Sequence, residues 1–168
     1  MAISLADILD EKNLVLDLRA RTQAEALREI IDVMKSNASI ADPEKFLAQV
    51  MKRERESSTV MEHTVAFAHA RTDLVKQIVL GLGRSQSGIP FPRTEIDDRI
   101  SPEHEPAADS VRLIFVIAVP KQLINDYLVC VGALARVVKD EARRAELLAA
   151  GSAAEIVEQL RAGSLLVE

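Results

Sequence analysis

Hydrophobic residues recur at helical spacing in two early segments of the chain. The first segment opens with Thr22 and Glu25, which form a capping-box pair. The second opens with Asp42-Pro43, where proline suits the first helical position. Spacings of three and four residues between apolar positions predict two amphipathic helices. Their apolar faces consist of Leu27, Ile30, Ile31 and Met34 in the first helix and of Phe46, Leu47, Val50 and Met51 in the second.

Short apolar runs of β-type composition predict the strands. Val111 to Val119 is a continuous apolar run that ends at Pro120, the pattern of a fully buried central strand. A run containing proline is tolerated only at a sheet edge, so Gly88 to Phe91 is predicted to be a short edge strand. The other extended segments are Leu14 to Leu18, Thr64 to Phe67 and Gln77 to Gly83, with residues 69–73 expected to connect the last two.

The segment from Pro92 to Asp109 is polar, with three prolines and eight charged residues, and is predicted to be a mobile loop over 92–109. After Pro120 the pattern is helical. We expect three helices there, the last capped by Ser152 and Glu155. The apolar face expected for the first of them consists of Ile124, Leu128, Val131, Ala135 and Val138.

These elements predict the fold class. Helices alternate with, and then follow, about four to five strands, which favours an α/β domain with a mixed central sheet and helices on both faces. No internal repeat and no linker divides the chain, so residues 1–168 are expected to form a single domain. Many functions share this architecture, so function has to be argued from a site.

Composition narrows the function classes. Aromatic residues make up 3% and the net charge is −5, which argues against a nucleic-acid-binding surface. No apolar run approaches the roughly 20 residues of a membrane helix, and no basic-then-apolar leader opens the chain. We therefore expect a soluble, cytoplasmic protein. The single cysteine, Cys130, excludes an intramolecular disulfide and is expected to be a buried thiol.

Of the three histidines, His69 has the most informative setting. It follows the predicted strand Thr64 to Phe67, at the expected turn, and Arg71 follows it closely. Neutral imidazole is nucleophilic near pH 7, and a guanidinium can hold phosphate oxygens. The bland interpretation, a half-buried histidine bonded to the turn, is favoured on spacing alone. His104 lies in the polar loop and is expected to be a solvated bystander.

His63 and His69 would share one strand face, which makes a two-histidine metal site conceivable. However, no carboxylate or thiol nearby has obvious ligand spacing. We therefore expect neither a metal nor a cofactor.

The stretch from Arg53 to Arg71, RERESSTVMEHTVAFAHAR, resembles the active-site region of IIA domains of the phosphoenolpyruvate-dependent sugar phosphotransferase system. The resemblance is to the fructose/mannitol class, which includes nitrogen-regulatory relatives. It continues through residues 79–91, the buried strand 111–120 and the final helices. It thus covers nearly the whole chain, and the order of motifs is more specific than any single one.

The resemblance implies that His69 accepts a phosphoryl group from a histidine phosphocarrier protein. The group would pass to a IIB domain of a membrane transporter or serve as a regulatory mark. The implied catalytic residues are His69, Arg53 and Tyr127, and the implied phosphate-binding residues are Arg71, Ser57, Thr59 and His63. Arg53 could instead be a solvated charge at a helix end.

The chain departs from the family pattern in four places. Ala68 and Ala70 replace a proline and a glycine beside the histidine, and Met61-Glu62-His63 replaces a glycine-containing turn. Tyr127 occupies the place of a supporting histidine and cannot carry its positive charge. An alternative therefore stays open, namely a IIA-like regulatory or interaction domain that is not phosphorylated and binds a transporter or a small ligand.

Overall fold

A mixed sheet of five strands forms the centre of the molecule in the computed structural model, which describes residues 8–37, 40–62, 64–92 and 108–165. The sheet order is β1-β4-β5-β3-β2. β5 pairs in parallel with β3 and antiparallel with β4. The strands are β1 (Leu14–Val15), β2 (Val60–Met61), β3 (Val65–Thr72), β4 (Val79–Pro92) and β5 (Ala108–Pro120). The predicted α/β class and mixed sheet are confirmed.

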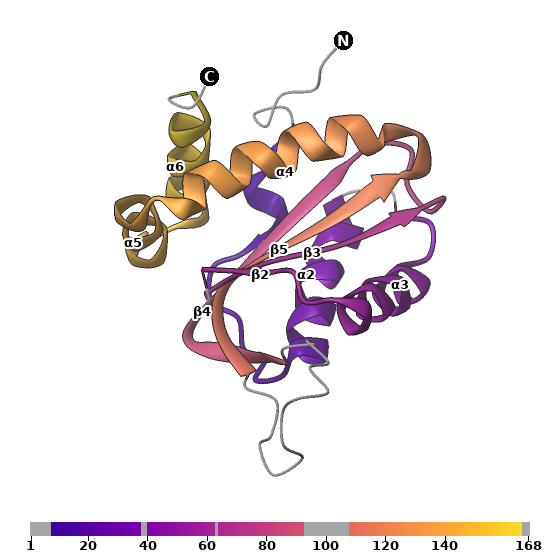
Figure 1. The fold of residues 1–168 in the computed structure, drawn as a ribbon, viewed down its shortest axis with the longest axis horizontal. Helices are drawn as coiled ribbons and strands as arrows, with labels where there is room; N and C mark the ends of the chain where they lie inside the picture. Colours follow the sequence, from indigo (N-terminus) through magenta and orange to yellow (C-terminus); the bar gives the residue numbers. More distant parts are fainter. Residues whose placement is uncertain (1–7, 38–39, 63, 93–107, 166–168) are drawn as a thin grey trace, which may run out of the picture.

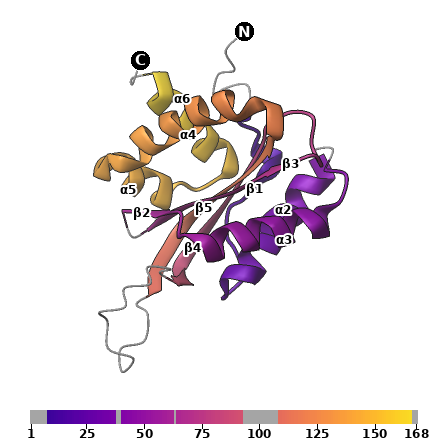
Figure 2. The same ribbon diagram turned by 45° about the vertical axis from the view of Figure 1, so that its right-hand side comes forward.

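Helices cover both faces of this sheet (Figures 1 and 2). α2 and α3 lie on one face, and α4 crosses the other with α5 and α6 beside it. None of the described helices combines the length and apolar composition needed to cross a bilayer. The helical elements are η1 (Glu11–Asn13), α2 (Gln23–Asn37), α3 (Pro43–Glu56), η2 (Lys121–Leu123), α4 (Ile124–Lys139), α5 (Glu141–Ala149) and α6 (Ala153–Leu165).

The caps expected from the sequence start their helices. The Thr22 and Ser152 hydroxyls accept from the backbone N–H groups of Glu25 and Glu155, at 3.2 and 3.1 Å. The Asp42 carboxylate accepts from the Lys45 N–H at 3.1 Å. These side chains satisfy N–H groups that a helix cannot pair internally.

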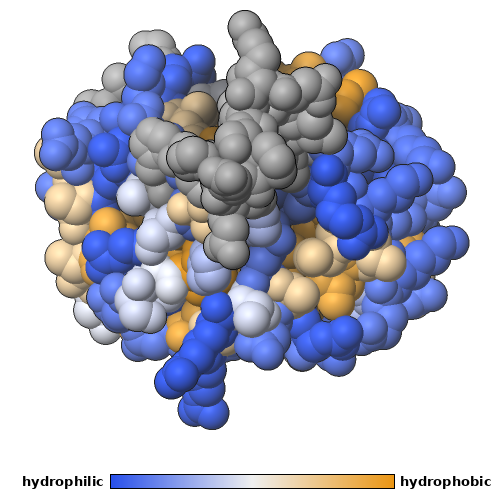
Figure 3. Space-filling view, turned by 60° about the horizontal axis from the view of Figure 1, so that its bottom comes forward, coloured by the Kyte–Doolittle hydropathy of each residue, from blue (hydrophilic) through white to orange (hydrophobic). Residues whose placement is uncertain are grey.

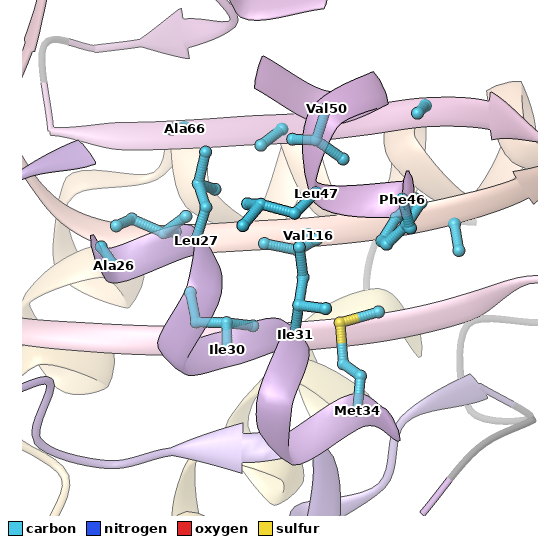
Figure 4. Packing of buried hydrophobic residues seen from close by; sticks show 14 of the residues in the cluster. Ala26, Leu27, Ile30, Ile31, Met34, Phe46, Leu47, Val50, Ala66 and Val116 are labelled. Atoms are coloured by element: carbon cyan, nitrogen blue, oxygen red, sulfur yellow. The ribbon is translucent and has the colours of Figure 1, made fainter. Parts of the chain in front are cut away.

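The sheet separates two apolar clusters. The alanines of β3 face α2 and α3, whose apolar stripes point toward the sheet (Figure 4). Val65 and Phe67, which alternate with these alanines along β3, face α4 and α6. Small side chains on β3 let α3 pack closely. The labelled residues of the first cluster are Ala26, Leu27, Ile30, Ile31, Met34, Phe46, Leu47, Val50, Ala66 and Val116.

Three strand predictions need correction. β3 does not end at Phe67 but continues to Thr72, because every residue from Val65 to Thr72 pairs with β5. Residues 88–91 are not a separate edge strand, since β4 continues past a bulge and pairs Ile89 with Val111. The extended segment at 14–18 is shorter than predicted, with strand pairing at Leu14–Val15 alone.

The expected face of α4 is wrong at one position. Val138 is buried, and Ile124, Val131 and Ala135 pack against the second apolar cluster. Leu128, placed there by its spacing, is 57% exposed. Apolar residues occur almost all round this helix, so spacing alone could not identify the face that contacts the sheet. The buried face consists of Tyr127, Cys130, Leu134, Val137 and Val138. Cys130 is a buried thiol, as predicted.

The predicted loop at 92–109 falls mostly on residues 93–107, which lie outside the described residues, as do His63 and His104. Its predicted end is slightly late, since β5 begins at Ala108.

Candidate functional site

His69 lies inside β3, near its carboxyl end, on the face that looks toward α4. β2 pairs only with the first part of β3, through Val60–Ala66 and Met61–Val65. Beyond these pairs β3 forms the edge of the sheet, while β5 supports it on the other side. His69 is therefore held by regular strand pairing and is only partly buried.

The ring of His69 has one nitrogen engaged. Nδ1 lies 3.0 Å from the Phe67 carbonyl oxygen. A carbonyl can only accept, so Nδ1 carries the proton of this bond. Burial lowers the pKa of His69; the Phe67 hydrogen bond raises it, and the positive charges of Arg53 and Arg71 lower it further. The neutral ring favoured at pH 7 then leaves a lone pair on Nε2.

Tyr127 packs against this ring from α4. The two ring centroids are 5.1 Å apart with an angle of 33° between the planes. Tyr127 is 7% exposed, and burial raises the pKa of its phenol. The residue that replaces the expected histidine is thus a neutral aromatic neighbour of His69.

Two arginines reach the same place from different elements. Arg53 lies in the last turn of α3, and its Nη1 donates to the Ser57 carbonyl at 2.9 Å. Arg71 follows His69 by two residues on β3 and is exposed. Because both charges act on His69, the two guanidinium groups could share an anion bound at Nε2.

A groove of about 510 Å³ opens beside His69. Its charged walls carry four cationic side chains and one carboxylate, although the whole chain has a net charge of −5. Such a local excess of positive charge attracts anions. The lining residues are Gln49, Lys52, Arg53, Glu56, His69, Ala70, Arg71, Lys121 and Ile124.

Ser57 and Thr59 do not belong to the groove walls. The Ser57 carbonyl holds Arg53, and the Thr59 hydroxyl donates to the Glu54 carboxylate. Glu54 is 4% exposed, and burial raises its pKa while the bonds from Thr59 lower it. This hydrogen-bonded pair links the end of α3 to the segment that leads into β2. Ser57 and Thr59, which were predicted to bind phosphate, thus support Arg53 and the end of α3 instead. His63 lies outside the described residues.

The two alanines beside His69 fit their positions. Ala68 and Ala70 pair with Val116 and Ala118 of β5 and face the α3 side. Among the described residues, Glu62 is the one non-glycine with a positive φ, at 54°. A left-handed backbone therefore occurs at the turn where the family pattern has glycine, and not beside the histidine.

Lys121 and Ile124 line the groove, although neither was predicted as a site residue. Both follow β5 directly, and the parallel pair Thr72–Pro120 brings the carboxyl ends of β3 and β5 together. Because parallel strands end at the same edge of a sheet, the residues after Pro120 could have been placed near His69 once this pairing was known.

Comparisons with known proteins bear on this arrangement. Residues 7–163 match the model of the family described as "Phosphoenolpyruvate-dependent sugar phosphotransferase system, EIIA 2". The chain belongs to this family. The predicted resemblance is thereby confirmed, and the family model covers nearly the whole chain.

Two curated relatives carry fructose-specific names. A fructose-specific EIIA component of Haloferax volcanii is 30% identical over 131 residues, covering 78% of this chain and 77% of that protein. The fructose-specific EIIABC component of Bacillus subtilis is 24% identical over 156 residues. This match covers 93% of the chain but only 23% of the longer protein.

Solved structures agree on the fold. The nitrogen regulatory protein IIA-Ntr of Neisseria meningitidis has a TM-score of 0.76 at 24% identity, covering 93% of this chain and 98% of that one. Mannitol IIA of Escherichia coli has a TM-score of 0.70 at 23% identity, covering 90% and 98%. Another match is a complex of mannitol IIA with phosphorylated mannitol IIB from the same organism, with a TM-score of 0.71 at 20% identity and 92% and 97% covered.

Proposed function

We propose that this IIA domain is a phosphoryl carrier that takes a phosphoryl group on Nε2 of His69 from a histidine phosphocarrier protein. The group then passes to a IIB domain of a sugar transporter or remains as a regulatory mark. The observation that carries the proposal is the state of His69, whose Nδ1–H is bonded to Phe67 and whose ring lines a groove together with Arg53 and Arg71. Since phosphoenolpyruvate is a cytoplasmic metabolite, the reaction would take place in the cytoplasm.

Transfer of the phosphoryl group requires only a few groups of this chain. The Nε2 lone pair attacks phosphorus, a P–N bond forms to His69, and the P–N bond of the donor phosphohistidine breaks. The donor imidazole leaves with that electron pair. The Phe67 carbonyl stabilises the Nδ1–H as the His69 ring gains positive charge. Arg53 and Arg71 neutralise charge on the phosphoryl oxygens during transfer.

Tyr127 has a positioning role in this proposal. Its ring restricts the rotation of His69 through the contact at 5.1 Å. Because a phenol stays neutral, it would stabilise a phosphoryl group less than an imidazolium would. We therefore expect a phosphorylated state that forms but is held less tightly than with histidine at this position.

Intact-mass measurement tests the proposal directly. Incubation with phosphoenolpyruvate, enzyme I and the phosphocarrier protein of the same organism should add one acid-labile phosphoryl group. The gain should disappear in His69→Ala and persist in His104→Ala. If the mass never rises under conditions that label a standard IIA domain, phosphotransfer is excluded. The chain would then be the regulatory or interaction domain that its departures from the family pattern keep open.

A further inference from the structure

Glu54 is a charged side chain that is buried beside the candidate site. Hydrophilic side chains make up much of the surface seen in Figure 3, as is usual for carboxylates and ammonium groups. Glu54 lies in the last turn of α3, is 4% exposed, and is the one buried glutamate in the described part of the chain. Burying a carboxylate costs free energy, so its hydrogen bonds decide what it contributes.

The first of these bonds fixes the segment that follows α3. The Thr59 hydroxyl donates to the Glu54 carboxylate across the connection formed by residues 57–59, which joins α3 to β2. At the other end of this connection the Ser57 N–H donates to the Arg53 carbonyl at 3.4 Å, and Arg53 Nη1 donates to the Ser57 carbonyl at 2.9 Å. The guanidinium of Arg53 is therefore held by a short connection whose far end is bonded to Glu54.

The same connection reaches His69 through one residue of β3. The Phe67 N–H donates to the Thr59 carbonyl at 3.2 Å, immediately before β2 begins. The Phe67 carbonyl in turn accepts from Nδ1–H of His69 at 3.0 Å. A series of three hydrogen bonds thus runs from the reactive ring through Phe67 and Thr59 to Glu54. Neighbouring hydrogen bonds in such a series support one another.

We propose that Glu54 is a positioning residue for phosphoryl transfer. Through Thr59 it holds in place the two groups that meet at the phosphoryl group, the guanidinium of Arg53 and the ring of His69. Glu54 itself is not among the residues that line the groove, so it acts through these groups rather than on phosphate. The inference rests on the proposed function, because it assumes transfer at His69, but the state of the His69 ring can be measured without transfer.

The competing explanation is that Glu54 only stabilises the fold. Removing one partner of a buried hydrogen bond leaves the other unpaired and is destabilising, whereas replacing both by apolar groups of similar shape is nearly neutral. A buried charge is likewise weak evidence for a contribution to stability. Positioning and stability can therefore be separated by changing both partners at once.

The decisive variant combines Glu54→Met with Thr59→Val, which removes the carboxylate and the hydroxyl while keeping their approximate shapes. The free energy of unfolding should stay close to wild type, because neither partner is left unpaired. The rate of His69 phosphorylation should fall about tenfold, in kcat rather than KM, because misplaced groups affect the transition state more than binding. A merely structural role would not produce that combination.

Two controls complete the set. Glu54→Gln keeps an acceptor oxygen for the Thr59 hydroxyl and should recover most of the rate. Ser85→Ala removes a hydroxyl on β4 that is outside the groove and accepts from the Gly88 N–H at 3.0 Å. Because Ser85 is 2% exposed, this change should lower the free energy of unfolding, while the phosphorylation rate should stay within about twofold of wild type.

Each variant is phosphorylated by the phosphocarrier protein of the same organism and by phosphoramidate, a small donor. Because the positioned groups belong to this chain, the loss in the double variant should be equal with both donors. Nitrogen-15 NMR of the unmodified chain reports the His69 ring. The wild-type ring should carry its proton on Nδ1, and the double variant should show more of the Nε2–H tautomer, since the Phe67 carbonyl is held less firmly.

The outcomes keep the two proposals apart. If neither donor labels the wild type, carrier function is rejected, and a change of His69 tautomer in the double variant would still support positioning by Glu54. Without labelling, an unchanged tautomer overturns it. With labelling, it is overturned if the double variant keeps the wild-type rate, loses rate with the phosphocarrier protein alone, or loses rate only in proportion to its free energy of unfolding.

Discussion

Two arginine environments in this molecule show how the surroundings of a cation decide its role. Arg84 on β4 is 3% exposed and donates to the carbonyl oxygens of Leu16, Leu147, Leu148 and Ala150, with the Asp17 carboxylate at 3.4 Å. Arg53 donates a hydrogen bond to the Ser57 carbonyl, and Arg71 is exposed beside His69. The donor groups of Arg84 form hydrogen bonds inside the fold. Arg53 and Arg71 instead line the groove beside His69.

The position of Arg84 has a simple physical reason. The last carbonyls of α5 have no partner within the helix and carry the negative end of its dipole. A planar guanidinium can serve several of them at once, which an ammonium group cannot do equally well. Arg84 therefore ties the segment before α2, the sheet and the end of α5 together, and it is a structural residue.

The largest effect is expected at this structural arginine. Arg84→Met should lower the free energy of unfolding by about 3–5 kcal/mol, because it leaves several buried carbonyls unpaired. Chemical denaturation measures this loss. The phosphorylation rate of the folded protein should stay close to wild type, and Arg84→Lys should recover only part of the stability. A large loss of rate in folded Arg84→Met would abolish the contrast with Arg53.

The opposite pattern is expected at Arg53. Arg53→Lys keeps the charge but loses the planar fork, so the rate of His69 phosphorylation should fall about 100-fold, or about 2.7 kcal/mol. The free energy of unfolding should change by less than about 0.5 kcal/mol, since the side chain is partly exposed. Single-turnover kinetics with denaturation curves on the same samples check both. Equal losses of rate and stability would make Arg53 a second structural arginine.

The pH dependence of His69 phosphorylation distinguishes Arg71 from Arg84. Its pKa lies below the ordinary value of 6.5, chiefly through burial, with Arg53 and Arg71 contributing. Phosphorylation by phosphoramidate should therefore fall only when the pH drops below that lowered pKa. Arg71→Gln should move the inflection upward, whereas Arg84→Lys should not. NMR titration of the imidazole measures the pKa directly. An unchanged inflection in Arg71→Gln would show that the Arg71 charge does not act on His69.

The same shift has a consequence for stability. Between 6.5 and the lowered pKa the unfolded chain binds more protons at this position than the folded one, so stability decreases as the pH falls through that window. His69→Gln should weaken this dependence.

The smallest effect is expected at the turn before β3. Glu62 has φ of 54°, a conformation that glycine adopts without strain. Glu62→Gly should raise the free energy of unfolding by about 0.5–1 kcal/mol, with the phosphorylation rate little changed. Glu62→Ala, which keeps a Cβ, is the control and should not be stabilising. A faster rate in Glu62→Gly would instead show that the carboxylate opposes the phosphoryl group.

Sequence patterns predicted the structure correctly where the deciding interactions lie within a few residues of one another. Capping pairs such as Thr22 with Glu25 mark helix starts because the bond is made within one turn. The apolar run 111–119 predicted a buried strand because both its faces lie under helices. The resemblance around His69 identified the family, which the match over residues 7–163 confirmed.

Tertiary pairing decided what local patterns could not. β3 extends to Thr72 because β5 supplies partners for polar residues that by themselves favour a turn. Leu128 is exposed because α4 is apolar on most sides, and only contact with the sheet selects which side is buried. Arg84, one of many arginines in the chain, becomes a structural residue only because folding brings the end of α5 to it.

The class of the fold, the helix starts and the candidate histidine could thus be predicted from the sequence, because these depend on neighbours along the chain. Arg53 and Arg71 were also predicted near that histidine, whereas Lys52 and Lys121 join them only through the fold. Lys52, Arg71 and Lys121 come from α3, β3 and the segment after β5, and they share a groove because β3 and β5 run parallel and end at one edge of the sheet. A charge pattern of this kind depends on positions in space, which no spacing along the chain specifies.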